Sequence, residues 1–225
     1  MKYYPVCLNI NGRNCLVVGG GSVGTRKVET LLRCGARVTV ISQSFTPVLR
    51  ALSESNQVTL REKAYDASDL TSMFLVFGAT DNRILNDAIR RDAERLNALF
   101  NSADDPESSC FVLPAVVERG DLTIAVSTAG NSPAFARKIK KDLDGQFGPE
   151  YAEFLRIMGA IRKKLLAETH DPKSHKDLFE RLIASGLLDE LKNENLNAVN
   201  ELVNGVLGPG YGYDELLGKK EDEET

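Results

Sequence analysis

The sequence feature that most constrains the fold is a glycine-rich turn between an apolar run and a helical pattern. Residues 15–18 read CLVV, residues 19–24 read GGGSVG, and a helix is expected over 22–34. In a dinucleotide-binding turn of this G-x-G-x-x-G form, the first glycine permits the tight turn, the second lets a pyrophosphate approach the backbone, and the third lets the helix pack against the strand. The phosphates then lie at the helix N-terminus, near its N–H groups and the positive end of its dipole. We therefore expect the cofactor to be bound by Gly19, Gly21, Ser22, Val23 and Gly24.

Strand and helix patterns alternate along the first part of the chain. An alternating stretch over 6–10 precedes the turn signal Asn11-Gly12, which predicts a hairpin leading into the strand at 15–18. The alternation predicts a Rossmann-type α/β domain over residues 1–110, with a parallel sheet and right-handed crossovers. The remaining strands are expected over 37–41, 58–62, 74–79 and 99–102, and the remaining helices over 45–53 and 82–96.

The pattern changes after this domain. Two strands over 111–118 and 122–127 and a helix over 133–143 predict a small α+β unit spanning residues 111–148. A two-stranded hairpin with one helix is marginal in water, so this unit is expected to pair with a second copy of itself in a homodimer. A helical domain is expected over 149–217, with helices over 151–167, 174–185 and 196–206, and the acidic residues 218–225 predict a disordered tail.

The composition narrows the class of partner. The chain has 225 residues and a net charge of -4, which favours neither nucleic acid nor an anionic membrane as a partner. No apolar run approaches a membrane span, and residues 1–5 lack the features of a signal peptide, so a cytoplasmic protein is expected. The four cysteines are scattered without a C-x-x-C pattern, which predicts small buried thiols rather than a zinc site or disulfides. His170 and His175 lie in a stretch typical of a helix–helix linker, where we expect solvent exposure rather than metal binding.

Polar residues without a carboxylate follow the second expected strand. An NAD-binding fold usually places Asp or Glu there, to bind the ribose hydroxyls. Here Ser42, Gln43 and Ser44 take that place, and the nearest Arg that would favour a 2′-phosphate is Arg50. Two interpretations stay open: these side chains bond the ribose, or they cap the next helix. NAD over NADP is expected only as a preference, and Thr80 is expected near the cofactor if the sheet is doubly wound.

A second polar cluster follows the last parallel strand, where the chain reads NSADDP from Asn101 to Pro106. Ligands of open α/β sheets bind outside the carboxyl ends of the strands, so Asp104 and Asp105 are expected to face the cofactor crevice. A carboxylate beside a nicotinamide can accept a proton or hold a metal ion. The alternative, which these residues by themselves favour, is that Asp-Asp-Pro only forms a turn.

A third cluster leads into the helix expected to start at Pro133. A loop of small polar residues before a helix N-terminus is suited to an anion, and cations follow on the same helix. The pattern fits a site for a substrate with several carboxylates, and it equally fits a well-capped helix with a solvated basic face. The candidate substrate-binding residues in this cluster are Ser127, Thr128, Gly130, Asn131, Ser132 and Arg137.

Three motifs in order point to a family. Residues 17–27 resemble the opening fingerprint of the siroheme-synthase dehydrogenase family, residues 101–106 resemble its N-V-x-D-x-P segment, and residues 124–133 resemble its S-[ST]-x-G-x-S-P segment. The likeness covers about the first two-thirds of the chain and is far more specific than the glycines alone. The chain departs from the pattern at Ser102, where Val is usual, at the additional acid Asp105, and at Thr128, where Ser is common.

The resemblance implies a function. Members of this family are precorrin-2 dehydrogenases that use NAD to oxidise precorrin-2 to sirohydrochlorin, and some also insert Fe²⁺ to give sirohaem. They are homodimers whose two copies contact each other through the middle unit. By this resemblance Asp104 assists proton removal, Asn101 belongs to the substrate site, and iron is a substrate near Asp104 rather than a resident metal.

Competing interpretations remain at this point. One is a dehydrogenase without chelatase activity. Another is a nucleotide-sensing regulatory module, although such modules usually carry the acid that is missing after the second strand. A third is an NAD-dependent dehydrogenase that acts on an unrelated small substrate.

Overall fold

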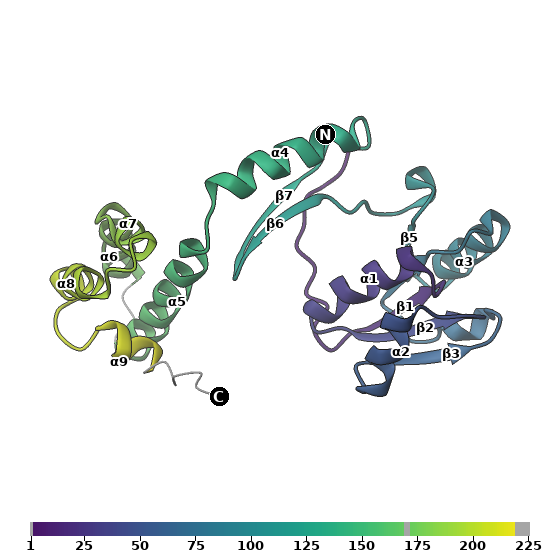
Figure 1. Ribbon diagram of the computed structural model, residues 1–225, viewed down its shortest axis with the longest axis horizontal. Coiled ribbons are helices and arrows are strands. Elements are labelled where there is room, and N and C mark those ends of the chain that lie inside the picture. The colour runs from purple at the N-terminus through teal and green to yellow at the C-terminus, as the bar shows by residue number, and fades with distance from the viewer. Residues whose placement is uncertain (1, 169–171, 219–225) are drawn as a thin grey trace. The chain divides into compact units, whose positions relative to one another are not determined.

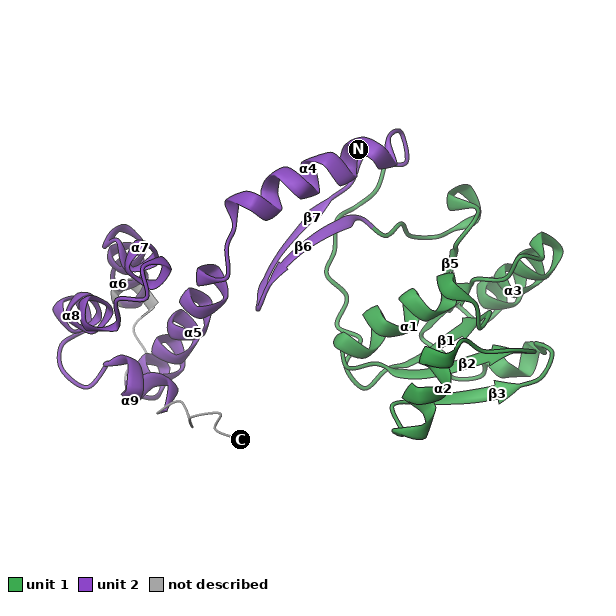
Figure 2. Ribbon diagram, in the orientation of Figure 1, with its two compact units in different colours: residues 1–113 green, residues 114–225 purple. Residues whose placement is uncertain are grey.

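The computed structural model describes residues 2–168 and 172–218. The chain divides between Leu113 and Pro114 into two compact units, which Figure 2 shows in different colours. The first unit contains the glycine-rich turn. The second contains the hairpin and the C-terminal helices.

The first unit is a five-stranded parallel sheet in the order β3-β2-β1-β4-β5, with helices on both faces (Figure 1). The predicted Rossmann-type fold is therefore confirmed. The chain order reverses between β1 and β4, which is where ligands bind in folds of this class. The strands are β1 (Asn14–Val18), β2 (Arg37–Ser42), β3 (Val58–Glu62), β4 (Leu75–Gly78) and β5 (Leu99–Ser102), and the helices are α1 (Ser22–Arg33), α2 (Pro47–Glu54) and α3 (Arg83–Arg95), with short 3₁₀ turns η1 (Ala67–Leu70) and η2 (Pro106–Ser108).

The sheet explains why the strand sequences are apolar without alternation. In β1, Cys15 and Val17 belong to one buried cluster, while Leu16 and Val18 belong to the cluster on the other face. A parallel strand that is covered on both faces needs apolar residues at every position. This central, rigid strand then fixes where the glycine-rich turn emerges.

The prediction of a strand over residues 6–10 is wrong. Gly12 adopts a φ of +67° and the N–H of Arg13 bonds the carbonyl of Ile10 at 2.9 Å, so the predicted turn forms. The residues before it form no strand, and Val6 and Leu8 are exposed. The reason is topological: β1 pairs with β2 on one side and β4 on the other, so neither of its edges can accept a hairpin partner.

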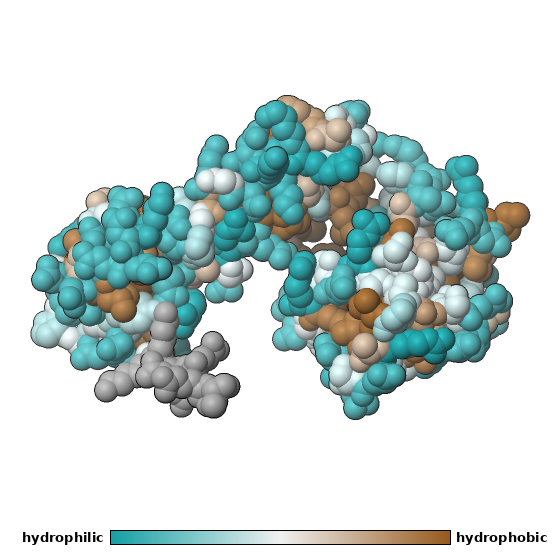
Figure 3. Space-filling model, in the orientation of Figure 1, coloured by the Kyte–Doolittle hydropathy of each residue, from teal (hydrophilic) through white to brown (hydrophobic). Residues whose placement is uncertain are grey.

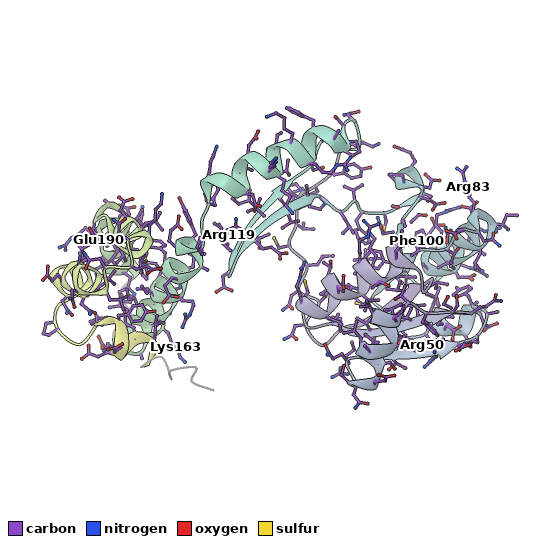
Figure 4. All side chains as sticks on the ribbon, in the orientation of Figure 1. Arg50, Arg83, Phe100, Arg119, Lys163 and Glu190 are labelled. Atoms are coloured by element: carbon purple, nitrogen blue, oxygen red, sulfur yellow. The ribbon has the colours of Figure 1, made fainter. Side chains whose placement is uncertain are left out.

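The second unit begins with an antiparallel pair, β6 (Ala115–Arg119) and β7 (Leu122–Val126), followed by α4 (Pro133–Gln146). The strand expected from residue 111 begins only at Ala115 because Phe111 packs against the core of the first unit. Arg119 joins the hairpin to the end of α4, since its guanidinium donates to the carbonyl of Phe147 at 2.7 Å and to the carboxylate of Asp144 at 2.9 Å (Figure 4).

The C-terminal part is helical, as predicted. Ile157, Ile161 and Leu165 lie on one face of α5 and form a buried core with the other helices. The sequence patterns did not indicate the short helices α7 and α9. The elements are α5 (Glu150–Glu168), α6 (Pro172–Ala184), α7 (Leu187–Lys192), α8 (Leu196–Leu207) and α9 (Tyr213–Leu217).

The structure also tests the expectations for the histidines and cysteines. His175 was expected to be exposed to solvent, but it is buried, because α6, in which it lies, packs into the helical core. All four cysteines are free, as predicted, but Cys15 is the one that is buried, while Cys7, Cys34 and Cys110 are exposed. His170 and the tail from residue 219 lie outside the described residues. Across the described ranges, none of the helices has the length and apolar character needed to cross a membrane.

Candidate active site

The glycine-rich turn has the geometry that its sequence predicts. Gly19 has a φ of +119°, and a Cβ there would lie 2.6 Å from the carbonyl carbon of Ala79. A Cβ on Gly24 would overlap the carbonyl oxygen of Gly19, so helix and strand are in contact here. A Cβ on Gly21, by contrast, would meet no atom of the described chain within 4 Å. The fold itself needs Gly19 and Gly24, whereas the bare backbone at Gly21 benefits only a group that approaches from outside.

The start of α1 is suited to an anion. Gly21 is its N-cap and makes no side-chain capping bond, and the first turn holds no acidic residue. The first intrahelical bond of the turn runs from the N–H of Thr25 to the carbonyl of Gly21 at 2.9 Å. The N–H groups at Ser22 and Val23 therefore belong to the donors that a helix leaves for a ligand. These residues, with Gly19 and Gly24, fit the pyrophosphate of a dinucleotide.

The loop after β2 folds onto the glycine-rich turn. The N–H of Thr46 donates to the carbonyl of Gly20 at 3.1 Å, and its hydroxyl lies 2.8 Å from that of Thr25. Thr46 is also the N-cap of α2, accepting the N–H of Leu49 at 3.3 Å. The interpretation of Ser42, Gln43 and Ser44 as the cap of this helix is therefore wrong. Gln43 and Ser44 are exposed beside the turn, and Ser42 is half-buried.

The ends of β4 and β5 are joined by a network of polar side chains. The hydroxyl of Thr80 donates to Oδ1 of Asn86 at 2.7 Å, and Nδ2 of Asn86 donates to Oδ1 of Asp104 at 3.2 Å. The hydroxyl of Ser102 donates to the same oxygen of Asp104 at 2.5 Å. Asn86 and Ser102 are buried, while Asp104 is exposed. An exposed carboxylate is thus held at the carboxyl edge of the sheet by buried donors.

The environment keeps Asp104 ionised. The hydrogen bond from Ser102 is the largest of the causes that hold the pKa of Asp104 below its ordinary value of 3.8. The backbone N–H of Asp104 itself, the bond from Asn86 and the positive charge of Arg83 lower the pKa further, and partial desolvation opposes them. Hydrogen bonds to a carboxylate favour its charged form. Asp104 is therefore an anion at neutral pH, able to accept a proton or attract a cation.

The two other polar residues of this segment have structural contacts. Asp105 accepts the N–H of Glu107 at 3.1 Å and caps the short turn η2, as the turn interpretation predicts for this residue. It also lies 3.6 Å from the guanidinium of Arg83, which Figure 4 shows at the start of α3. Asn101 is buried and donates to the carbonyl of Phe111 at 2.9 Å. Of the residues from 101 to 106, the exposed carboxylate of Asp104 is thus the best placed for chemistry.

The loop between β7 and α4 lies in the second unit. Its hydroxyls accept backbone N–H groups of the loop and helix: Ser127 bonds Ala129 at 3.2 Å, Thr128 bonds Ser132 at 3.2 Å, and Ser132 bonds Phe135 at 3.2 Å. Gly130 has a φ of +87°, and both Gly130 and Asn131 are exposed. Arg137 is exposed on α4. The hydroxyls shape the loop, and its outward groups are the amide of Asn131 and the cation of Arg137.

Sequence reasoning placed the first-unit candidates correctly at one edge of the sheet but missed Asn86. Gly19 to Gly24, Ser42 to Ser44, Thr80 and Asp104 all follow the carboxyl ends of β1, β2, β4 and β5. Asn86 could have been found from its place one turn after the N-cap Asn82, in the helix that begins at this edge. Among the residues that the structure describes, no group of three or more His, Cys, Asp or Glu side chains could hold a metal ion.

Comparisons with known proteins agree with this geometry. A family model described as NAD(P)-binding matches residues 6–115, and one described as sirohaem biosynthesis protein central matches residues 119–146. The two occur in order and together span more than half of the chain. The chain belongs to the siroheme synthase N-terminal family. Its first unit is accordingly an NAD(P)-binding domain.

Individual relatives extend the match through the helical part. The chain is 30% identical to a siroheme synthase of Acinetobacter baylyi over 96% of its own length, and 29% identical to siroheme synthase 1 of Serratia proteamaculans over 92%. It spans about half the length of these curated relatives, 50% and 45% respectively. Among solved structures, SirC, a precorrin-2 dehydrogenase, superposes with a TM-score of 0.71 at 26% identity, covering 91% of this chain and 98% of that one.

Proposed function

We propose that this chain is an NAD-dependent precorrin-2 dehydrogenase that oxidises precorrin-2 to sirohydrochlorin. The observation that carries the proposal is the ionised, doubly hydrogen-bonded Asp104 at the carboxyl edge of an NAD(P)-binding sheet. The likeness to SirC over nearly the whole of both chains supports the same substrate. The family resemblance of residues 101–106 and 124–133 supports it independently.

The residues fit the two halves of the reaction. Conversion of precorrin-2 to sirohydrochlorin removes one hydride and one proton from the macrocycle. The nicotinamide, when bound, supplies the hydride acceptor. Asp104 accepts the proton: loss of hydride leaves the macrocycle cationic, so its proton is acidic and even a weakly basic carboxylate can take it. The N–H groups at the start of α1 orient the cofactor through its pyrophosphate.

The charges around the end of β2 support NAD over NADP. A 2′-phosphate needs a cation at this place. Arg50 lies 3.7 Å from Glu62, and Arg61 and Lys63 both pair with the buried carboxylate of Asp69. These cations are already opposed by carboxylates. We expect Ser42, Gln43 and Ser44 to bond the ribose, Thr80 to lie near the nicotinamide, and kcat/KM to be higher with NAD than with NADP.

The second unit is proposed to contribute substrate contacts and the dimer interface. The acetates and propionates of the macrocycle need cations and N–H donors, which Arg137, Asn131 and the start of α4 can supply. The sheet of β6 and β7 has only two strands, so each has an unpaired edge. Phe135 is 54% exposed on α4, and Figure 3 shows further apolar residues on the surface of this part. Sedimentation at micromolar concentration tests the homodimer; a monomer would contradict it.

The test of the activity is an anaerobic assay with enzymatically generated precorrin-2, followed by absorbance. Sirohydrochlorin that forms only when NAD is present establishes the dehydrogenase. If precorrin-2 stays unchanged with NAD, the reaction proposed here is wrong and a nucleotide-sensing module becomes the better account. If precorrin-2 neither reacts nor changes the thermal stability of the protein while a small hydroxy acid does, the substrate is of another class.

Iron insertion is a separate question for the same preparation. Addition of Fe²⁺ after the oxidation tests whether sirohaem forms faster than it does without protein, with Asp104 the residue placed to attract the ion or take up pyrrole protons. Without such acceleration the protein is a dehydrogenase alone. We place the reaction in the cytoplasm, because three exposed cysteines that remain free fit a reducing compartment.

A further inference from the structure

We propose that Ser102 and Asn86 are positioning residues that hold one oxygen of Asp104 and leave the other to receive the substrate's proton. The inference rests on the proposed function of Asp104. It goes beyond it by assigning the orientation and charge of that carboxylate to two buried side chains on different elements. Both hydrogen bonds end on Oδ1, at 2.5 Å from Ser102 and 3.2 Å from Asn86, so Oδ2 is engaged by neither side chain.

Ser102 contributes the shorter bond. Ser102 lies at the end of β5 and is 5% exposed, and its hydroxyl donates to a carboxylate two residues later. Its own N–H is fixed by the hydroxyl of Ser109 at 2.8 Å, so the backbone that carries the donor is anchored.

Asn86 contributes the second bond and connects Asp104 to the cofactor side. Its Oδ1 accepts the hydroxyl of Thr80 at 2.7 Å, and its Nδ2 donates both to the carbonyl of Thr80 at 3.0 Å and to Asp104. An ionised carboxylate only accepts, so the NH₂ group must face Asp104 and the amide has a single orientation. A Cβ on Gly78 would lie 3.2 Å from Oδ1 of Asn86, so the bare glycine gives this amide its room. One buried side chain thereby links the strand end expected at the nicotinamide to the proton acceptor.

The charged groups around Asp104 support this assignment. Arg83 at the start of α3 is 79% exposed in its side chain and lies against Asp105, so it acts on Asp104 only as a solvated neighbour. Asp105, the next residue in the chain, carries a negative charge, opposite to that of Arg83. The hydrogen bond of Ser102 lowers the pKa of Asp104 more than the positive charge of Arg83 does. Donors, rather than ion pairs, therefore hold the carboxylate in its charged form.

The test measures the pKa of Asp104 directly, by carbon NMR of the full chain labelled at its aspartate carboxyl carbons. Asp104→Asn assigns the signal by removing it. Ser102→Ala should raise the pKa of Asp104, because a donor to the ionised form is lost. Ser102→Thr, which retains a hydroxyl, should return it toward the starting value. Ser108→Ala is the matched control, since that hydroxyl donates to the carbonyl of Asp105 at 2.9 Å and contacts neither Ser102 nor the carboxylate of Asp104; it should leave the pKa unchanged.

The pH dependence of activity is the second measurement. The acid side of the pH profile of kcat should move to higher pH in Ser102→Ala and in Asn86→Leu, and Ser102→Ala should cost nothing further when Asp104 is already Asn. An Asp104 pKa that is the same in Ser102→Ala as in the unchanged protein overturns the assignment. Full turnover by Asp104→Asn overturns instead the proposed role of Asp104, and the NMR result tells the two failures apart.

Discussion

The two glycines Gly21 and Gly24 should respond in opposite ways to the same added methyl group. A Cβ on Gly24 would overlap the carbonyl oxygen of Gly19 and lie 3.1 Å from its carbonyl carbon, so β1 and α1 must separate to admit it. Forcing a methyl group into a packed contact costs about 1–3 kcal/mol, and here the neighbour is backbone that cannot rotate away. We expect Gly24→Ala to lose about 2–3 kcal/mol of unfolding free energy, or on the order of 5–10 °C in Tm.

The same change at Gly21 has no such cost. Its φ of -80° and ψ of -172° are accessible to alanine, and the Cβ meets nothing within 4 Å in the described chain. The smaller freedom of the unfolded chain offsets the weaker N-cap, so stability should change by less than about 1 kcal/mol. The methyl group would, however, occupy the place where a pyrophosphate approaches the backbone, and the Kd for NAD should rise at least about tenfold.

Thermal unfolding without ligand and titration with NAD measure the two effects. Gly21→Ala should have the Tm of the unchanged protein and a lower affinity for NAD, whereas Gly24→Ala should have a lower Tm. If Gly21→Ala binds NAD as tightly as the unchanged protein, the pyrophosphate does not approach the backbone at Gly21. If Gly24→Ala melts at the same temperature as the unchanged protein, the contact between α1 and β1 does not limit stability.

Two further predictions concern the second unit. Burial raises the pKa of Tyr211 and of Tyr213 from 10.0 to about 12, with Glu168 adding to the shift at Tyr211 and Glu153 at Tyr213. Because the tyrosines of the unfolded chain ionise at lower pH, the second unit should lose unfolding free energy as the pH rises from 10 towards 12. Denaturant titrations at pH 9 and 11 should show a smaller loss for Tyr213→Phe than for the unchanged protein, and an equal loss in both proteins would contradict the prediction. Ile161 is fully buried in the helical core, so Ile161→Ala should lower the unfolding free energy by about 2–4 kcal/mol, whereas Leu166→Ala on the exposed side of α5 should lower it by less than about 0.5 kcal/mol. The affinity of Ile161→Ala for NAD should be unchanged, because the NAD(P)-binding domain is the other unit. A loss of NAD binding in Ile161→Ala would contradict the assignment of cofactor binding to the first unit.

The parts of the fold that could be predicted are those where the local sequence has one physical solution. The apolar run of β1, the positive φ of Gly19 and the contact at Gly24 follow from the glycine spacing, and all three are present. The helix expected from residue 45 likewise begins close to its predicted place, at Pro47, because the hydroxyl of Thr46 caps its first turn and proline suits that position.

The failures come from contacts distant in sequence. Residues 6–10 alternate like a strand, but whether they pair depends on β2 and β4 occupying both edges of β1. Burial of His175 depends on the packing of α6 in the helical core. Asn86 was missed because its contact with Asp104 forms only when α3 brings it to the end of β5, and its place one turn after Asn82 was the one local signal.

The most direct test of the central claim compares the unchanged protein with Asp104→Asn under anaerobic conditions, measuring NAD binding and a single turnover of precorrin-2 on the same samples. Asp104 is exposed and its substitution leaves the buried donors in place, so the variant should fold and bind NAD with unchanged affinity. We expect it to form sirohydrochlorin at least about a hundredfold more slowly, the scale of a lost proton acceptor. A variant that binds NAD and turns over at the original rate would show that Asp104 is not the proton acceptor.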